Sequence, residues 1–196
     1  EGTDLAGQPE DDVVLDAVAA PLHPVPAAVE ARLAHMLAAG CAARMVGALE
    51  RLLAIGTGYA MEREQFGRPI AKFQAVQHQL AILAGEVAAS IRAVDAAAER
   101  AGAELLDPDD PSAGVFAVRA AAAKARVGEA AGPATEIAHQ VLGAMGFTYE
   151  HALHQYTRRL WAWRDQHGSE THWQAALGER VLAAGADGLW GFLTAH

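Results

Sequence analysis

Apolar side chains recur every three or four residues along most of the chain, which is the spacing of an amphipathic α-helix. Residues 29–63 contain no proline, and their larger apolar side chains share one broad face: Leu33, Met36, Leu37, Met45, Leu49, Leu52 and Ile55. The same spacing returns after a break at residues 67–69: Phe73, Val76, Leu80, Leu83, Val87, Ile91 and Val94. The pattern predicts two long helices that run antiparallel on either side of a short turn.

Three further helices are predicted in the second half of the chain, over about residues 113–142, over about 151–164 and from 170 onward. The turns before them are rich in glycine, proline or aspartate, at residues 106–112 and 143–147. Gly132 and Pro133 should interrupt or weaken the first of these helices, and Gly185 and Gly188 punctuate the end of the last. We therefore predict an all-α fold, an up-down helical bundle that occupies residues 29–196.

Residues 1–28 do not follow the helical spacing. Glycine, proline and acidic residues dominate positions 1–12, and three prolines at 21, 24 and 26 break regular structure. Between them, residues 13–18 form a short apolar run with β-branched side chains, which suits a strand or the remnant of one. We expect a short extended segment ahead of the helical domain.

Composition supports a helical protein and excludes several classes of partner. Of the 196 residues, 52% are hydrophobic but only 6% aromatic, because alanine, the strongest helix former, dominates. The net charge of −9 and the absence of a basic stretch argue against nucleic acid. Cys41, the single cysteine, excludes an internal disulfide and fits a reducing cytoplasm. No apolar run approaches the roughly 20 residues that span a bilayer, so we expect a soluble, cytoplasmic protein.

The segment that joins the first two predicted helices holds the most informative residues. It reads Arg63-Glu-Gln-Phe66-Gly67, and Gln74 opens the next helix. An arginine fork there can pair with a diphosphate, and Phe66 can pack on a flat ring. The same residues also suit an ordinary helix hairpin, whose last turn favours a basic residue through the helix dipole. The residues alone leave both interpretations open.

A known family carries the same pattern. The segment resembles the arginine-x-x-Phe-Gly hairpin, followed by a glutamine, of the C-terminal domain of acyl-CoA dehydrogenases. A later segment, Gln140-Val-Leu-Gly143-Ala144-Met-Gly146-Phe147, resembles the family's Gln-x-x-Gly-Gly-x-Gly-Phe turn. The two matches stand in the family's order, and the resemblance extends over about residues 13–183. It implies a homotetramer or a related assembly, in which the bundle of one subunit completes the FAD site of its neighbour.

The resemblance also implies roles for individual residues. Arg63 would contact the diphosphate of FAD, with Phe66 and Gln74 beside it. Gln140 and Gly143 would line the adenosine side across the subunit interface. Ala144 replaces the family's second glycine, so a methyl group stands where the backbone should approach the cofactor closely: the six cofactor-binding candidates are Arg63, Phe66, Gln74, Gln140, Gly143 and Ala144.

The family's catalytic carboxylate is missing from both of its usual places. The reaction removes a proton beside the thioester carbonyl while a hydride passes to the flavin, and a glutamate acts as the base. The Tyr-Glu-Gly-Thr place is filled here by Gln166-His167-Gly168-Ser169, and the alternative place on the first helix holds Leu37. His167 is a weak candidate base, because imidazole titrates near neutrality. We favour a surface histidine in a decayed site and assign no catalytic residue.

Other polar residues give weaker signals. His151 and His154 are three residues apart, but no convergent carboxylates accompany them, so we expect no metal site. Lys124 stands in an alanine-rich helix, where we expect a solvated or snorkelling side chain. Trp161 and Trp163 are two residues apart on a predicted helix and suit a subunit interface.

Two functional hypotheses remain. The family's N-terminal helical domain and central β-domain have no counterpart here, and residues 1–28 resemble only the end of that β-domain. The chain would then be a fragment or a naturally short relative, contributing FAD-binding residues to a partner subunit that carries the glutamate. Its resemblance to a bacterial branch implies acyl-CoA substrates, steroid side chains among them, and an electron-transfer acceptor. The alternative is a helical oligomerisation or interaction module that has lost flavin binding.

Overall fold

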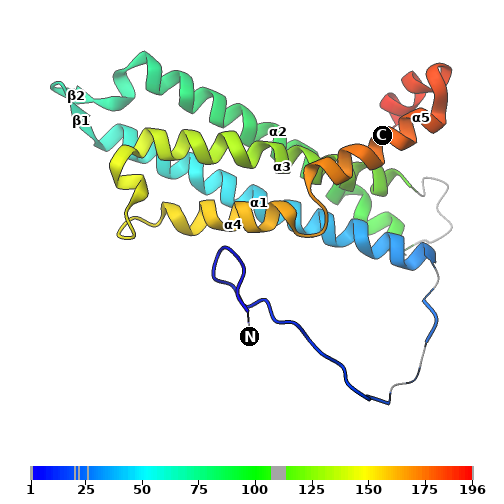
Figure 1. Ribbon diagram of the computed structural model, residues 1–196. Helices are drawn as coiled ribbons and strands as arrows, with labels where there is room; N and C mark the ends of the chain where they lie inside the picture. Colours follow the sequence, from blue (N-terminus) through cyan, green and yellow to red (C-terminus); the bar gives the residue numbers. More distant parts are fainter. Residues whose placement is uncertain (1, 20, 22, 26, 107–113, 196) are drawn as a thin grey trace.

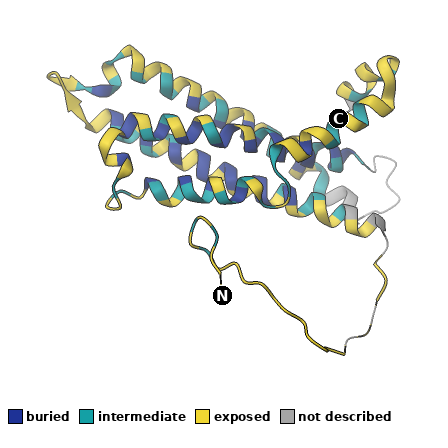
Figure 2. Ribbon diagram, in the orientation of Figure 1, coloured by how far each residue is buried: buried dark blue, intermediate teal, exposed yellow. Residues whose placement is uncertain are grey.

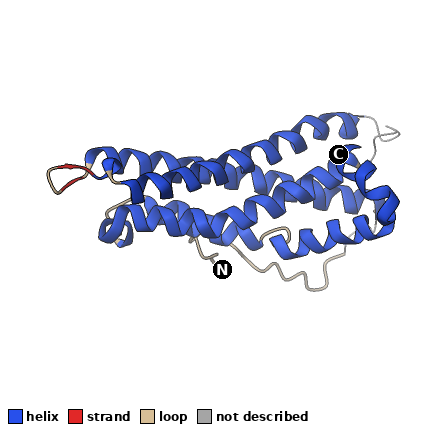
Figure 3. Cartoon of the chain, turned by 90° about the horizontal axis from the view of Figure 1, so that it is seen from above, coloured by secondary structure: helices blue, strands red, loops and turns tan. Residues whose placement is uncertain are grey.

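The computed structural model describes residues 2–19, 21, 23–25, 27–106 and 114–195, and its long helices lie side by side as a bundle (Figures 1 and 3). The α-helices are α1 Ala27–Glu62, α2 Gln74–Leu106, α3 Val115–Leu142, α4 Leu153–Asp165 and α5 Glu170–Ala195. The short elements between them are β1 Glu64–Gln65, β2 Arg68–Pro69, and the 3₁₀ turns η1 Ile70–Lys72 and η2 Gly143–Phe147. The predicted all-α, up-down architecture is confirmed. Residues 107–113, which include most of the predicted loop at 106–112, lie outside the described residues.

The core forms where the apolar faces of the first three helices meet (Figure 2). Met45, Leu49 and Leu52 are fully buried on α1, at the spacing that the sequence predicts. α3 contacts α1, α2, α4 and α5, and much of its buried surface is alanine. Small side chains let neighbouring helices approach closely, so α3 is enclosed on several sides without large apolar residues.

α3 runs without a break from Val115 to Leu142, so the expected interruption near Gly132 and Pro133 is wrong. Pro133 lies exposed on the outer side of the helix, while its neighbours Ala131 and Ala134 are fully buried. The proline removes one backbone donor on the solvent side. Packing on the inner side holds the helical path despite that loss.

The turn between α1 and α2 is a tight β-hairpin. Glu64 pairs with Pro69 and Gln65 with Arg68, so Phe66 and Gly67 are the two central turn residues. Both have positive φ, 52° and 77°, which is the geometry of a type I′ hairpin turn. The left-handed conformation costs a non-glycine residue about 1–2 kcal/mol. It holds the Phe66 ring outside the bundle, 91% exposed.

The expected strand at residues 13–18 is wrong. These residues are exposed and adopt no strand, because no described strand lies beside them to pair with. Residues 2–10 instead form a small loop, closed by a bridge between Thr3 and Pro9, that rests on α4. There Arg158 Nε donates to the Leu5 carbonyl at 2.7 Å, and Trp163 Nε1 donates to Gln8 Oε1 at 2.9 Å. The assignment of residues 1–28 to a preceding domain stays a prediction.

α5 leaves the bundle as it proceeds (Figure 1). Its first turn is tied to α4, because Arg164 Nε donates to Glu170 Oε2 at 3.0 Å and a second guanidinium nitrogen contacts Oε1. Gly185 has φ 71° and ψ 174°, which is not helical, and the segment beyond it turns away. None of the helices in the described part of the chain is long and apolar enough to cross a membrane.

Leu49→Ala should destabilise the protein by about 2–5 kcal/mol, because it leaves a cavity between fully buried side chains. The free energy of unfolding from a urea titration measures this. Leu182→Ala is the matched control: its side chain is 81% exposed, so its effect should stay within about 0.5 kcal/mol. Equal losses in the two variants would contradict the assigned core.

Glu170→Gln should remove stability that depends on pH. The hydrogen bond from Arg164 lowers the pKa of the Glu170 carboxyl in the folded protein. A lowered folded pKa contributes stability above the unfolded pKa of about 4.3, and the contribution disappears as pH falls through the folded value. In denaturant titrations at neutral pH, the free energy of unfolding of the wild type should exceed that of the variant by about 1–2 kcal/mol, a range that allows for the partial exposure of the pair. In acid the two proteins should have equal free energies of unfolding.

Glu99→Gln controls for the loss of a carboxylate as such. Glu99 is 64% exposed and lies 3.5 Å from Arg119, so its ion pair should contribute at most about 0.5 kcal/mol. A Glu170→Gln deficit that persists unchanged in acid would show that packing, and not the ion pair, is responsible.

Candidate functional site

A cavity of about 710 Å³ opens at the end of the bundle that carries the β-hairpin. Five of the six predicted cofactor-binding residues line it: Arg63, Phe66, Gln140, Gly143 and Ala144. The first two come from the end of α1 and the hairpin turn, and the others from the end of α3 and from η2. Segments distant in the sequence therefore meet at one concave surface.

Local backbone contacts place both sets of residues. The Ile70 N–H donates to the Arg63 carbonyl at 2.8 Å, and buried Ile70 anchors the hairpin to the bundle. α3 ends at Gly143, whose φ of 58° lies in the left-handed region and whose N–H bonds to the His139 carbonyl. Apart from its chain neighbours and the adjoining helix backbone, no described atom lies within 4 Å of where a Gly143 side chain would begin. Its conformation requires glycine, and the space beside it stays open.

Gly146 is required for a different reason. A side chain there would begin 3.1 Å from Leu142 Cβ and 3.2 Å from Leu153 Cδ2, which is tighter than ordinary packing. Glycine at this position lets the start of α4 pack directly against η2. The spacing of the glycines in the Gln140–Phe147 segment therefore reflects one backbone requirement and one packing requirement.

The polar groups of the cavity suit an anionic ligand with flat rings. Arg63 and Gln140 are exposed, and neither side chain has a hydrogen-bond or ion-pair partner among the described residues. Phe66 and Phe73 supply aromatic surface, with ring centroids 6.0 Å apart in an edge-to-face arrangement. The described lining contains no carboxylate that would repel a phosphate. A guanidinium fork, amide groups, aromatic rings and an open glycine turn fit the diphosphate and rings of a dinucleotide.

Gln74 is not among the residues that line the cavity. It is exposed at the first position of α2, and its binding role stays a prediction. Gln79, five residues further along α2, does line the cavity together with Val76. The spacing of three residues between them places both on one helix face, which is the sequence signal that could have identified Gln79.

The second candidate region is the loop 166–169, at the other end of α4. A helix of 13 residues separates it from η2, a length of about 20 Å. His167 is exposed with a positive φ of 57°, and it does not line the cavity. Burial of part of its ring, and then the charges of Arg44 and Lys124, lower the pKa of its imidazole. Leu37, at the alternative carboxylate position, is half-exposed on α1.

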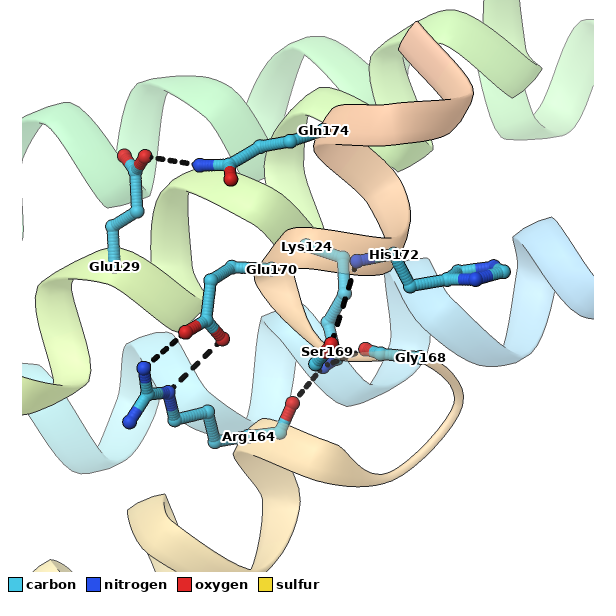
Figure 4. Close-up of polar contacts among 8 residues, drawn as sticks. All are labelled: Lys124, Glu129, Arg164, Gly168, Ser169, Glu170, His172 and Gln174. Carbon is cyan, nitrogen blue, oxygen red and sulfur yellow. Dashed lines mark hydrogen bonds and ion pairs between the residues drawn. The ribbon is translucent and has the colours of Figure 1, made fainter.

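Lys124 is fully buried, so the expectation of a solvated side chain is wrong. Its ammonium donates to the carbonyl oxygens of Arg164 at 2.6 Å and Gly168 at 2.7 Å (Figure 4). These acceptors compensate for the water that the charge loses. The burial of Lys124 could not be predicted from the alanine-rich sequence around it, because both acceptors are backbone atoms of a distant segment.

The chain matches known proteins over most of its length. Residues 27–181 match the family model described as acyl-CoA dehydrogenase, C-terminal domain. The acyl-CoA dehydrogenase IpdE2 of Mycobacterium tuberculosis is 36% identical over 118 residues, which is 60% of this chain and 33% of that protein. The chain thus spans about a third of this relative's length.

Solved structures share the bundle. Butyryl-CoA dehydrogenase from Megasphaera elsdenii superposes with a TM-score of 0.68 at 27% identity, over 78% of this chain and 38% of that one. The ChsE4-ChsE5 complex from Mycobacterium tuberculosis gives 0.67 at 29% identity, over 77% and 38%. Together with the helical fold and the match of residues 27–181, these likenesses show that the chain belongs to the acyl-CoA dehydrogenase family, of which it carries the C-terminal helical domain.

Proposed function

We propose that this chain forms one wall of an FAD site that a second subunit completes, in an assembly that dehydrogenates an acyl-CoA at its α and β carbons. Members of the family are FAD flavoproteins. One observation carries the proposal: Arg63, Phe66, Gln140 and Gly143, which come from two distant segments, line one open cavity. Its exposed guanidinium and amide groups have no partner within the described part of the chain.

Each lining residue has a definite task in this proposal. Arg63 binds the diphosphate through its guanidinium fork, which matches phosphate oxygens in pairs. Phe66 packs against the cofactor, since its ring is 91% exposed on the hairpin turn. Gln140 donates from its amide, and Gly143 leaves the turn open beside it. When bound, FAD supplies the hydride acceptor for the reaction.

Ala144 and Gln74 complete the proposed set of cofactor-binding residues. Ala144 lines the cavity, and its methyl group takes up space where the family pattern has glycine. Gln74 lies outside the lining, on the exposed first turn of α2. From there its amide would reach a group held by the partner.

A second subunit is part of the proposal because the cavity is open to solvent, so this chain would form only one wall of the FAD site. The assembly is a homo-oligomer or a hetero-oligomer, and the structural relative ChsE4-ChsE5 is itself a complex of two named components. Leu37 and His167 stand at the two carboxylate positions of the family pattern, so the partner would supply the base. His167 remains the weak internal candidate.

Arg63→Ala should weaken FAD binding, because it removes a charge-assisted contact worth about 1.5–3 kcal/mol, which corresponds to a ten- to hundredfold higher Kd. The measurement is flavin absorbance per protein after purification of the full-length protein with its natural partner, followed by FAD titration of the stripped assembly. Gln140→Ala should have a smaller effect, about tenfold or less.

Arg51→Ala is the matched control. Arg51 is exposed on the same helix but does not line the cavity, so its removal should leave the Kd for FAD unchanged. Equal weakening in Arg51→Ala and Arg63→Ala would reduce the effect to net charge and contradict the assigned site. An assembly that holds no flavin with any partner would instead favour a helical interaction module.

A further inference from the structure

Lys124 occupies an environment that is unusual for a lysine. The side chain is fully enclosed, and burial lowers the pKa of its ammonium. An ionised group in such a place is tolerated only where hydrogen-bond acceptors replace the lost water. Both acceptors are main-chain carbonyls, those of Arg164 and Gly168. The ammonium therefore bridges the last turn of α4 to the end of the loop that follows it (Figure 4).

The Arg164 carbonyl is one of the orphan acceptors that every helix leaves in its last turn. The Lys124 ammonium donates a hydrogen bond to this carbonyl and a second one to the Gly168 carbonyl, four residues further along the chain. The two backbone oxygens are thus fixed on one nitrogen. The path of residues 165–167 between them is restricted by this single side chain from α3.

Other contacts hold the same loop at its remaining points. Trp173 Nε1 donates to the His167 carbonyl at 2.9 Å, and an Arg44 guanidinium nitrogen donates to Gln166 Oε1 at 3.2 Å. Gly168 has φ 93°, and a side chain there would begin 2.7 Å from Trp173 Nε1. Glycine therefore permits both the turn and the approach of the indole.

None of these contacts uses the His167 imidazole. The side chain is exposed, and its backbone sits at φ 57°, in the left-handed region that is uncommon for residues other than glycine. The loop conformation is thus set by groups outside residue 167. Two charged groups on neighbouring elements act on its imidazole, Arg44 on α1 and Lys124 on α3. The charged or titratable residues that flank the loop in the sequence are Arg164, Asp165, Glu170 and His172.

We propose that Lys124 is a positioning residue, whose ammonium fixes the backbone of the loop 166–169 and so presents the His167 imidazole at a fixed place on the protein surface. The imidazole is held there in its neutral form at pH 7, because burial and the charges of Arg44 and Lys124 lower its pKa. A neutral imidazole accepts a hydrogen bond or a proton from a group outside the loop. This role does not depend on flavin binding at the hairpin end.

Lys124→Met tests the proposal in the full-length protein, because it keeps the apolar length of the side chain and removes the ammonium. Amide hydrogen exchange at residues 166–169 should accelerate by about tenfold or more, while exchange in the core of α1 remains as in wild type. Carbethoxylation by diethylpyrocarbonate, which modifies neutral imidazole, should show a pH midpoint for His167 that rises in the variant. His78, exposed on α2, serves as the internal reference.

Arg126→Met is the matched control on the same helix. Arg126 contacts Glu86 and Glu129 and none of the loop residues, so its removal should leave both loop measurements unchanged. Unchanged exchange and an unchanged His167 midpoint in Lys124→Met would overturn the proposal. Equal acceleration in the loop and in the α1 core would overturn it too, since Lys124 would then act only on global stability.

A wild-type measurement decides the matter if Lys124→Met does not fold. Lys72, the other lysine of the chain, is exposed and should react at once with an amine acylating reagent. Lys124 should react only at the rate at which the amides of residues 166–169 open, because the same event releases both. Loop amides that exchange while Lys124 stays unreactive, or a Lys124 that reacts as fast as Lys72, would overturn the positioning role.

Discussion

Close packing around α3 is the constraint on which the rest of the structure depends. The helix contacts α1, α2, α4 and α5, and its buried side is largely alanine. Side chains this small allow the neighbours to approach, but they leave little room for any of them to shift. The positions of both candidate regions therefore depend on α3, which carries Gln140 in its last turn and Lys124 nearer its start, and which ends at Gly143.

The two regions use polar groups in opposite ways. At the hairpin end, Arg63 and Gln140 have no hydrogen-bond partner within the described residues, although folding brings them to one cavity. At the other end of α4, the polar groups satisfy one another, as the Lys124 ammonium and the Arg164–Glu170 pair do. Exposed groups left free beside a cavity suit a ligand, whereas satisfied buried groups fix a conformation. The contrast separates the proposed binding surface from a rigid support.

Helical spacing predicted the elements of the bundle because burial on one face imposes it directly. The same reasoning failed at Pro133, since packing of Ala131 and Ala134 outweighs one missing backbone donor on the outer side. It failed again at Lys124, whose burial depends on backbone carbonyls that no local pattern contains.

The cavity could not be derived from spacing either, because periodicity does not say which helix ends meet. The segments around Arg63 and Gln140 were placed together by their resemblance to a family, and the structure brings them to one surface. Gln79 was overlooked because that family pattern marks Gln74, although the helical register with Val76 pointed to it. Resemblance to a family pattern thus identifies which segments form a site more accurately than it identifies the individual side chains.

The contacts that hold the loop 166–169 explain why the type of side chain at position 167 can change without loss of the loop conformation. The contacts that fix the loop end on the main chain of residues 164, 167 and 168, or on the side chains of Gln166 and Glu170. A change of side chain at position 167 therefore removes no contact that holds the fold. The α4 helix also separates this position from the hairpin cavity by about 20 Å. Replacement of a carboxylate at 167 would consequently leave the proposed flavin-facing wall intact, which is what a subunit that binds cofactor for a partner requires.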